Sequence, residues 1–411
     1  MIMPARIRQP ALSRLSSSPR RAIPVTIVCG APGAGKTALI ERWIEAHGQR
    51  RFAIIADTSP RPENAVGGVG ATAFHVRGSV EAFLSQSITD TRQDVLCQEL
   101  FRTLDSGDVD GVFIEAGLTA DPATMVAALR QQRPGYALVD LLDVARVVTV
   151  LDCARLQDDY ASTQALVERD RRIPPSDERT VANIVALQIE SADTIVLNKT
   201  DLASAQLRRE VCDIATVLNP GAQRIQTRFG ELEESGMAAD DLFGRVDRAH
   251  YGPGWLRYLE ETLPTTHAYQ VSRCVYKRRR PFHPERLMTL LDNGWPWTLR
   301  TRGQFWIASR PDWAIDIQQA GTSVAIQPFG YWWASDVVGG CTPEDPQLLE
   351  ALNQLWHPLY GDRRQHVAIL GVDFDPVTLE RDLDDCLLTD AELAGGWNHW
   401  RAMADPWPVW R

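Results

Sequence analysis

The chain contains a stretch whose residue types and spacing suit phosphate binding. Residues 30–37 fit the pattern G-x-x-x-x-G-K-[ST] and follow an apolar run at 25–29, which is the strand-to-helix setting that the motif requires. Glycines let such a loop curl until successive N–H groups face one centre, where the following helix adds its positive end. Lys36 would then reach the terminal phosphates, and the Thr37 hydroxyl would ligate Mg²⁺. The residues expected to cradle the phosphates are Gly30, Gly33, Ala34, Gly35, Lys36 and Thr37.

A second motif, Asn198-Lys199-Thr200-Asp201, follows an apolar run at 194–197. Ligands of open α/β sheets gather at the carboxyl ends of the strands, so both motifs are expected at one edge. The Asp201 carboxylate can accept hydrogen bonds from N1–H and the 2-amino group of guanine. Adenine offers neither donor, and an aspartate left unpaired penalises ATP. Asn198 would brace the loop and contact the base, and the Lys199 stem would lie along its face, which predicts a site for GTP.

The distribution of lysine supports both motifs. Only three of the 43 basic residues are lysine, and two of these, Lys36 and Lys199, lie inside the motifs, while the third is Lys277. A compact ammonium can fit between phosphate oxygens where the planar arginine fork fits poorly. In a chain that otherwise uses arginine, this placement favours a geometric requirement over chance.

Three carboxylates follow other apolar runs. Glu115 is expected to orient Mg²⁺ directly or through water, and Asp57 is a candidate for the metal or for the attacking water. Each could instead be a solvated carboxylate at the end of a strand. Asp152 is interpreted as a loop-capping residue and is left outside the site. The expected catalytic residues are therefore Lys36, Asp57 and Glu115, with Thr37 and Glu115 as the Mg²⁺ ligands.

The first part of the chain alternates short β-branched runs with amphipathic ones. Strands are expected at 25–29, 52–56, 111–114, 146–151 and 194–197, and helices at 37–46, 94–104, 122–131, 180–190 and 205–218. This alternation predicts an α/β fold, a P-loop NTPase domain with a mainly parallel sheet and right-handed crossovers.

The last third of the chain follows a different pattern. Strands are expected at 268–275, 298–308, 314–327 and 366–372, and helices at 284–291, 346–356 and 377–387. The first six elements succeed one another as β-α-β-β-α-β, which is the split arrangement of a smaller ferredoxin-like α+β domain. The last helix is expected to pack alongside.

Composition marks the domain boundary. Twelve of the 13 tryptophans follow residue 250, Trp43 being the exception, and glycine and proline are frequent just after it. The expected division is a disordered basic leader at 1–24, a nucleotide-binding domain at 25–249, a linker at 250–266 and a second domain at 267–411.

Charge and cysteine content exclude several classes of protein. The formal charge of −10 argues against wholesale binding of nucleic acid. Apolar runs fall short of the roughly 20 residues that span a membrane. Seven scattered cysteines form no Cys-x-x-Cys pair, so a disulfide framework is not expected and a reducing cytoplasm fits best.

Together these residues resemble the CobW family of P-loop GTPases, which includes metallochaperone-like proteins and nitrile hydratase activators. The resemblance covers nearly the whole chain after residue 25. Besides the two nucleotide motifs, the similar segments are 114–122 (the family's Walker B segment), 188–190 and 219–222 in the first domain, and 280–287, 303–308, 387–390 and 405–408 in the second, which is similar to the CobW C-terminal domain. The resemblance implies slow hydrolysis of GTP, coupled to transfer of zinc, cobalt or iron to a client metalloprotein.

The chain departs from the family in three places. The family's Cys-x-Cys-Cys metal motif is replaced at 84–91 by a segment without cysteine, and Cys97 is isolated. Soft divalent metals prefer thiolates, so the usual ligands for Zn²⁺ or Co²⁺ are absent there. Gly117 stands two residues after Glu115 rather than three, and the segment 58–70 has Glu63 where relatives carry an acidic pair.

The sequence therefore predicts a GTP-binding and GTP-hydrolysing accessory protein for a client metalloprotein. Bound γ-phosphate would order the segment 58–92, and hydrolysis would release it. Two alternatives stay open. One is a GTPase that remodels its client without carrying metal, which the missing cysteines favour. The other is a P-loop kinase acting on a small molecule, against which the guanine motif counts.

Overall fold

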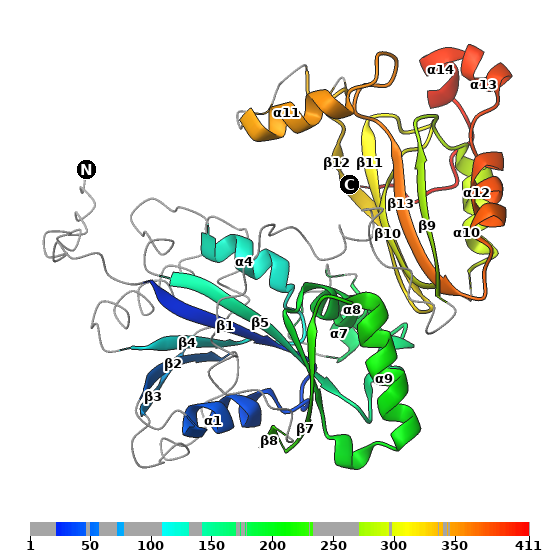
Figure 1. Ribbon diagram of the computed structural model, residues 1–411. Helices are drawn as coiled ribbons and strands as arrows, with labels where there is room; N and C mark the ends of the chain where they lie inside the picture. Colours follow the sequence, from blue (N-terminus) through cyan, green and yellow to red (C-terminus); the bar gives the residue numbers. More distant parts are fainter. Residues whose placement is uncertain are drawn as a thin grey trace, which may run out of the picture.

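A computed structural model describes residues 22–46, 50–56, 72–77, 109–130, 142–169, 173, 177, 179–229, 231–232, 271–295, 298–335, 337–339, 343 and 346–410. The described elements form two sheets, each with its own helices (Figure 1). Residues 1–21 of the expected leader at 1–24, the expected helix at 94–104 and the linker at 250–266 lie outside the described residues. The first strand begins at Ile23, inside the expected leader, because Ile23 and Pro24 pair with Leu142 and Asp143.

The N-terminal sheet has eight strands in the order β3-β2-β4-β1-β5-β6-β7-β8, all parallel except the last pair. Its strands are β1 (Ile23–Cys29), β2 (Arg51–Ala56), β3 (Thr72–Arg77), β4 (Gly111–Glu115), β5 (Leu142–Asp152), β6 (Thr194–Asn198), β7 (Gln223–Arg228) and β8 (Glu231–Leu232). The helical segments are α1 (Lys36–Ala46), α4 (Pro122–Arg130), α6 (Leu156–Tyr160), α7 (Leu166–Arg169), α8 (Val181–Ser191), η1 (Thr200–Leu202) and α9 (Ala205–Leu218). The expected parallel α/β sheet is confirmed.

Strands β3, β7 and β8 were not expected from the sequence. In β7 only alternate positions are buried, because Ile225 and Thr227 point inward while arginine and glutamine side chains face water. Such a strand has a weak apolar signal, since it lies toward the edge of the sheet and buries one face.

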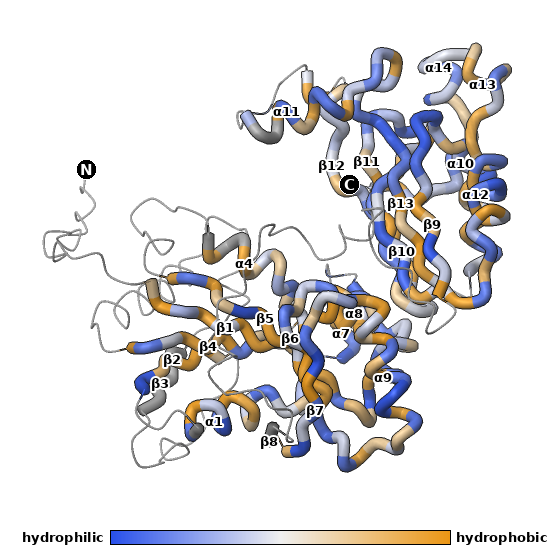
Figure 2. Tube along the Cα trace, in the orientation of Figure 1, coloured by the Kyte–Doolittle hydropathy of each residue, from blue (hydrophilic) through white to orange (hydrophobic). Residues whose placement is uncertain are grey.

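Apolar side chains fill both faces of this sheet, so its central strands are continuous apolar runs. These strands are largely orange, the colour of hydrophobic residues, in Figure 2. On one face Trp43 of α1 packs on Phe113, with ring centroids 6.1 Å apart, and Phe52 packs on the same ring at 5.5 Å. On the other face α4 and α8 cover the strands. The carboxyl ends of β1, β4, β5 and β6 are thereby held rigidly side by side.

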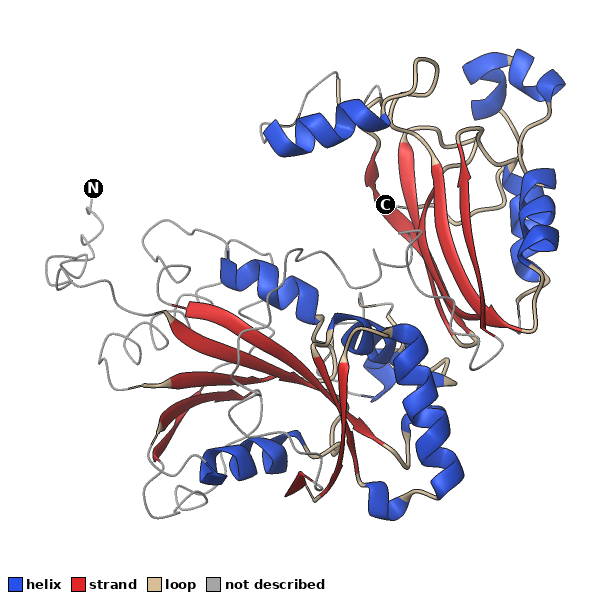
Figure 3. Cartoon of the chain, viewed as in Figure 1, coloured by secondary structure: helices blue, strands red, loops and turns tan. Residues whose placement is uncertain are grey.

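The C-terminal sheet is antiparallel, in the order β12-β11-β10-β13-β9. Its strands are β9 (Val271–Arg278), β10 (Thr298–Phe305), β11 (Trp313–Ala320), β12 (Ser323–Tyr331) and β13 (Gln365–Val372), and its helices are α10 (Pro284–Asp292), α11 (Pro346–Leu355), α12 (Pro376–Asp385), α13 (Asp390–Ala394) and α14 (Gly396–Arg401) (Figure 3). Since β13 lies between β9 and β10 and is antiparallel to both, β9-α10-β10 is a split βαβ unit.

The second domain has one strand more than the sequence predicts. The segment 314–327 was expected to be a single strand, but a turn at Gly321 and Thr322 divides it into β11 and β12. Gly321 has φ of +52°, a left-handed conformation that glycine adopts without strain. The turn was missed because β-branched and alternating residues flank it closely on both sides.

His366 of β13 lies on the face of this sheet opposite α10 and α12, because its neighbour Val367 points into the core beneath those helices. Its Nε2 is buried without a hydrogen-bond partner in the described structure. Burial, with the nearby charges of Lys277 and Arg364, lowers the pKa of the imidazole from 6.5 to about 4. The ring is therefore neutral at pH 7.

This histidine makes the C-terminal domain sensitive to acid. The unfolded chain protonates His366 near pH 6.5 and the folded chain only near pH 4, so stability is lost as pH falls between these values. After allowing for solvent screening, we expect the wild type to lose about 1 kcal/mol more than His366→Gln between pH 7 and pH 5. Urea unfolding of both proteins at the two pH values measures this, and equal losses would refute it.

Among the described helices, none combines the length and the apolar character that crossing a membrane requires.

Candidate functional site

The turn between β1 and α1 has the geometry of an anion-binding loop. Gly30 and Gly35 have φ of +141° and +103°, which side-chain-bearing residues rarely adopt. A Cβ atom on Gly30 would lie 2.3 Å from the Val150 carbonyl oxygen, and one on Gly35 would lie 2.2 Å from Nδ2 of Asn198. Both glycines are thus required by backbone conformation and by close packing against β5 and β6.

Lys36 begins α1, and its side chain folds over this loop. Its Nζ donates hydrogen bonds to the Gly30 carbonyl at 2.8 Å and to the Ala31 carbonyl at 3.2 Å. Burial lowers the pKa of the ammonium below its ordinary value, and the negative charge of Glu115 opposes that shift. The loop therefore surrounds a buried cation at the positive end of a helix, a combination that favours phosphate oxygens.

Thr37 and Glu115 meet beside Lys36. The Thr37 hydroxyl donates a 2.7 Å hydrogen bond to Oε1 of Glu115, which is the last residue of β4. Strand β4 pairs with β1 so that Glu115 lies opposite Val28. A hydroxyl and a carboxylate oxygen are ligands that Mg²⁺ prefers, so this pair fits the metal that accompanies a triphosphate.

The second motif is bonded directly to the phosphate loop. Asn198, at the end of β6, donates from Nδ2 to the Ala34 carbonyl at 2.8 Å. Its Oδ1 accepts a 2.9 Å hydrogen bond from the Thr227 hydroxyl of β7. The Asn198 side chain thus connects the end of β6 to the phosphate loop. The bond joins residues 164 positions apart and places both motifs at one edge of the sheet.

Lys199 forms an ion pair with Asp152, a residue expected only to cap a loop. Its Nζ lies 2.7 Å from Oδ2 of Asp152, a buried residue at the end of β5. Asp152 also caps the following turn, because its Oδ1 accepts from the Ala154 N–H at 3.0 Å. The capping interpretation is thus correct but incomplete. The ion pair depends on β5 and β6 being neighbours in register, with Asp152 opposite Asn198, and strand order was not assigned from the sequence.

Asp201 lies in the short helical turn η1, with an exposed side chain. The turn is held by the Thr200 hydroxyl, which donates to the Thr227 carbonyl at 3.1 Å, and by Arg208, which donates to the Thr200 carbonyl at 3.2 Å. Lys199 enters the turn with φ of +59°, a left-handed conformation uncommon for lysine. The Asp201 carboxylate is therefore presented at the rim of the edge where the phosphate loop lies.

Two features predicted from the sequence, a catalytic carboxylate and the segment that replaces the family's metal motif, are not among the described residues. Asp57 and the cysteine-free segment 84–91 lie outside the described residues, as does Cys97. Within the described ranges, no group of three or more His, Cys, Asp or Glu side chains is placed to hold a metal ion.

The fold and the loop geometry define a P-loop nucleotide-binding domain followed by an antiparallel domain. The family described as CobW/HypB/UreG, nucleotide-binding domain, matches residues 24–226, and the cobalamin synthesis protein cobW C-terminal domain matches residues 271–387. The chain therefore belongs to the CobW family, as its resemblance predicted.

Relatives with curated names point the same way. A zinc-regulated GTPase metalloprotein activator 1 of Dictyostelium discoideum is 29% identical over 401 residues, covering 93% of this chain and 84% of that protein. A zinc chaperone of Mycobacterium tuberculosis is 29% identical over 276 residues, covering 67% of this chain and 64% of its own length. The crystal structure of Zn(II)-bound YjiA GTPase from E. coli aligns with 90% of this chain and 100% of its own, at 16% identity and a TM-score of 0.35.

Proposed function

We propose that this protein binds and slowly hydrolyses Mg²⁺–GTP and couples that cycle to metal delivery to, or activation of, a client metalloprotein. The observation that carries the proposal is the hydrogen bond from Asn198 to Ala34, because it joins a phosphate loop and a guanine-reading motif into one site. Membership of a family whose nucleotide-binding domain matches here supports the same reading.

The phosphate end of the site suits hydrolysis by in-line attack of water. Lys36 and the N–H groups of Gly33, Ala34 and Gly35 would stabilise the negative charge that develops on the transferred phosphoryl group. Thr37 and Glu115 would hold Mg²⁺, which neutralises charge on the phosphate oxygens when bound. Asp57 remains our candidate for orienting the attacking water. Slow turnover is expected, since no arginine is assigned to the transition state.

The base end of the site suits guanine. Asp201 would accept from N1–H and the 2-amino group, Asn198 would contact the base while bracing the loop, and Lys199 would lie along the ring face. Since Asp201 is exposed at the rim, its two oxygens are accessible to a base entering from solvent.

The metal side of the proposal rests on the relatives. Proteins named zinc chaperone and zinc-regulated GTPase metalloprotein activator are similar to this chain, so zinc is the first metal to test and a metalloprotein the expected client. The cysteine-free segment 84–91 favours a role in remodelling the client over carriage of Zn²⁺ or Co²⁺ by thiolates. The five described cysteines are free thiols, which supports a cytoplasmic location.

Product analysis tests the proposal. Purified protein with Mg²⁺ and GTP should release GDP and phosphate, and should leave small-molecule acceptors unphosphorylated. Failure to bind GTP would refute the function, and a phosphorylated acceptor would establish the kinase alternative. Equilibrium titration with Zn²⁺ then separates the two accessory roles, because a sub-micromolar affinity that strengthens with GTP would identify a carrier.

Asp152 provides a prediction about the base end. Asp152→Asn keeps the turn-capping oxygen but removes the charge that holds Lys199. A hydrogen bond between charged groups contributes about 1.5–3 kcal/mol, and part of this would be lost from nucleotide binding, so we expect GTP affinity to fall about 10-fold. Calorimetry should show no further loss when Asp152→Asn is added to Lys199→Met. Additive losses would mean that Asp152 acts independently of Lys199.

A further inference from the structure

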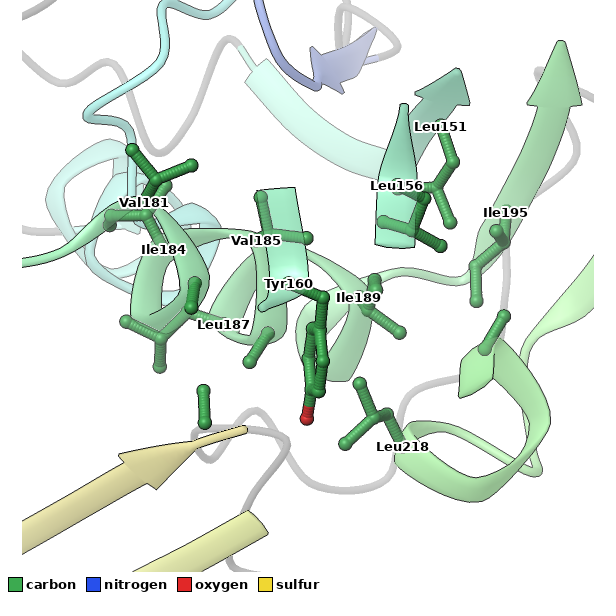
Figure 4. Packing of buried hydrophobic residues seen from close by; sticks show 14 of the residues in the cluster. Leu151, Leu156, Tyr160, Val181, Ile184, Val185, Leu187, Ile189, Ile195 and Leu218 are labelled. Atoms are coloured by element: carbon green, nitrogen blue, oxygen red, sulfur yellow. The ribbon is translucent and has the colours of Figure 1, made fainter. Parts of the chain in front are cut away.

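Helix α8 lies between the nucleotide site and the C-terminal sheet. Its residues 181–190 are all buried, and Thr180 caps its first turn by accepting from the Asn183 N–H. Figure 4 shows its aliphatic side chains, among them Val185 and Ile189, packed beside Tyr160 of α6. The polar side chains of α8 are therefore enclosed, and each must find its partner inside the protein.

Gln188, one of these polar side chains, holds the loop that follows Glu115. Gln188 donates from Nε2 to the Leu118 carbonyl at 3.3 Å and to the Ala120 carbonyl at 3.0 Å. The Gln188 carbonyl in turn accepts from the Thr149 hydroxyl of β5 at 2.7 Å. The loop 116–121 directly follows Glu115, the residue proposed to orient Mg²⁺. Gln188 therefore fixes the backbone three and five residues beyond that carboxylate.

Glu190, half a turn further along α8, binds the C-terminal domain. Glu190 accepts from Arg300 of β10 in a two-pronged ion pair, with Nε–Oε1 at 2.5 Å and Nη2–Oε2 at 3.0 Å. The side chains are 0% and 1% exposed, so the pair is fully enclosed between the domains. Arg300 also donates to Oδ1 of Asn183 at 3.2 Å and to the Gln319 carbonyl at 3.1 Å.

Polar contacts surround this buried pair. The Tyr160 hydroxyl donates to the Leu299 carbonyl at 2.8 Å, and the Thr180 and Ser323 hydroxyls lie 2.6 Å apart. Arg302, two residues beyond Arg300 on the same face of β10, forms an ion pair of 3.6 Å with Asp316 of β11. The C-terminal sheet is therefore linked to the loop 116–121 through Gln188 and Glu190 of α8.

We propose that α8 couples the nucleotide site to the C-terminal domain, with Gln188 as the positioning residue for loop 116–121 and the Glu190–Arg300 pair as the interdomain link. The proposal rests on the proposed function, because it requires GTP and GDP to favour different arrangements of that loop. An enclosed ion pair tolerates misalignment poorly, since each charge is costly to bury without its partner. A shift of the loop therefore alters how well the C-terminal sheet docks, and by linkage docking alters the preference between GTP and GDP.

The test uses the full chain and three variants. Gln188→Met removes the two donors to the loop, and Glu190→Met with Arg300→Met removes both buried charges together, a change that is often neutral for folding. The control, Arg278→Met with Asp384→Asn, disrupts a two-pronged pair of 2.7 and 2.8 Å within the C-terminal domain. Near-ultraviolet circular dichroism verifies that each variant is folded.

Two readouts are compared with bound GDP and with a non-hydrolysable GTP analogue. Hydrogen exchange is followed in peptides that contain residues 156–161 and 320–323, which border the interface, and the ratio of the two nucleotide affinities is measured by fluorescence. We expect the wild type and the control to show exchange that depends on the nucleotide. Gln188→Met and the double variant Glu190→Met with Arg300→Met should both lose that dependence. Each should change the ratio of the GTP-analogue and GDP affinities about 5-fold or more, within the usual range of coupling between sites.

The outcomes separate the inference from the function on which it rests. A wild type that binds neither nucleotide overturns both. A wild type that binds both nucleotides with identical exchange at the interface overturns the coupling alone, as do folded variants that keep the wild-type difference and the wild-type affinity ratio.

Discussion

Replacing Lys36 with alanine is expected to lower the rate of GTP hydrolysis by about 100- to 1,000-fold, the usual cost of removing one preorganised donor from a transition state. The ammonium lies over the phosphate loop, 2.8 Å from the Gly30 carbonyl, in a buried position where its charge is poorly screened. Phosphate release under saturating GTP and Mg²⁺ measures the effect.

The chain offers a matched control for this substitution. Lys277 is the one lysine outside the two nucleotide motifs, and its side chain is exposed on β9 of the C-terminal domain. Lys277→Ala should hydrolyse GTP at the wild-type rate. Equal rates for Lys36→Ala and the wild type would mean that Lys36 does not stabilise the transition state of hydrolysis.

Replacing Asp201 with asparagine is expected to change the base that the site prefers from guanine to xanthine. The carboxylate would accept two hydrogen bonds from guanine. The amide oxygen of asparagine can still accept from N1–H, but its NH₂ group faces the 2-amino group, and these two donors have no acceptor between them. GTP affinity should fall about 100-fold or more. Xanthosine triphosphate should bind the variant better than GTP, because the 2-carbonyl of xanthine accepts from that NH₂ group.

The comparison for Asp201 is another exposed carboxylate of the nucleotide-binding domain. Asp158 is exposed on α6, and Asp158→Asn changes the net charge equally, so its affinities should match those of the wild type. Calorimetric titrations with the three nucleotides GTP, ATP and xanthosine triphosphate give the whole pattern. An Asp201→Asn protein that retained the wild-type preference for GTP would place guanine recognition elsewhere.

Much of the nucleotide-binding domain could be predicted from local sequence. Helix α9 has the predicted bounds, because Ser204 caps its first turn and its apolar positions repeat at helical spacing. The phosphate loop could also be recognised, since its glycines are dictated by backbone conformation and by contact with β5 and β6. The cap and the apolar spacing of α9 are local, and the phosphate loop is recognisable because its glycines, Lys36 and Thr37 lie within residues 30–37.

Features that depend on strand order could not be predicted. The ion pair between Asp152 and Lys199 requires β5 and β6 to be adjacent, and the pair between Glu190 and Arg300 joins residues 110 positions apart in two domains. The segment that contains Glu190 was noted only for its resemblance to relatives. An isolated glutamate near the end of an apolar helix carries no signal of its partner, so the interdomain contact emerges only from the tertiary structure.

One site is proposed to bind a triphosphate at one end and to identify guanine at the other. Calorimetry of the full chain with GTP and with ATP, both with Mg²⁺, compares the two nucleotides at that site. GTP should bind at least about 100-fold more tightly, because adenine leaves the Asp201 carboxylate unpaired. Equal affinities for GTP and ATP would show that the site does not recognise guanine.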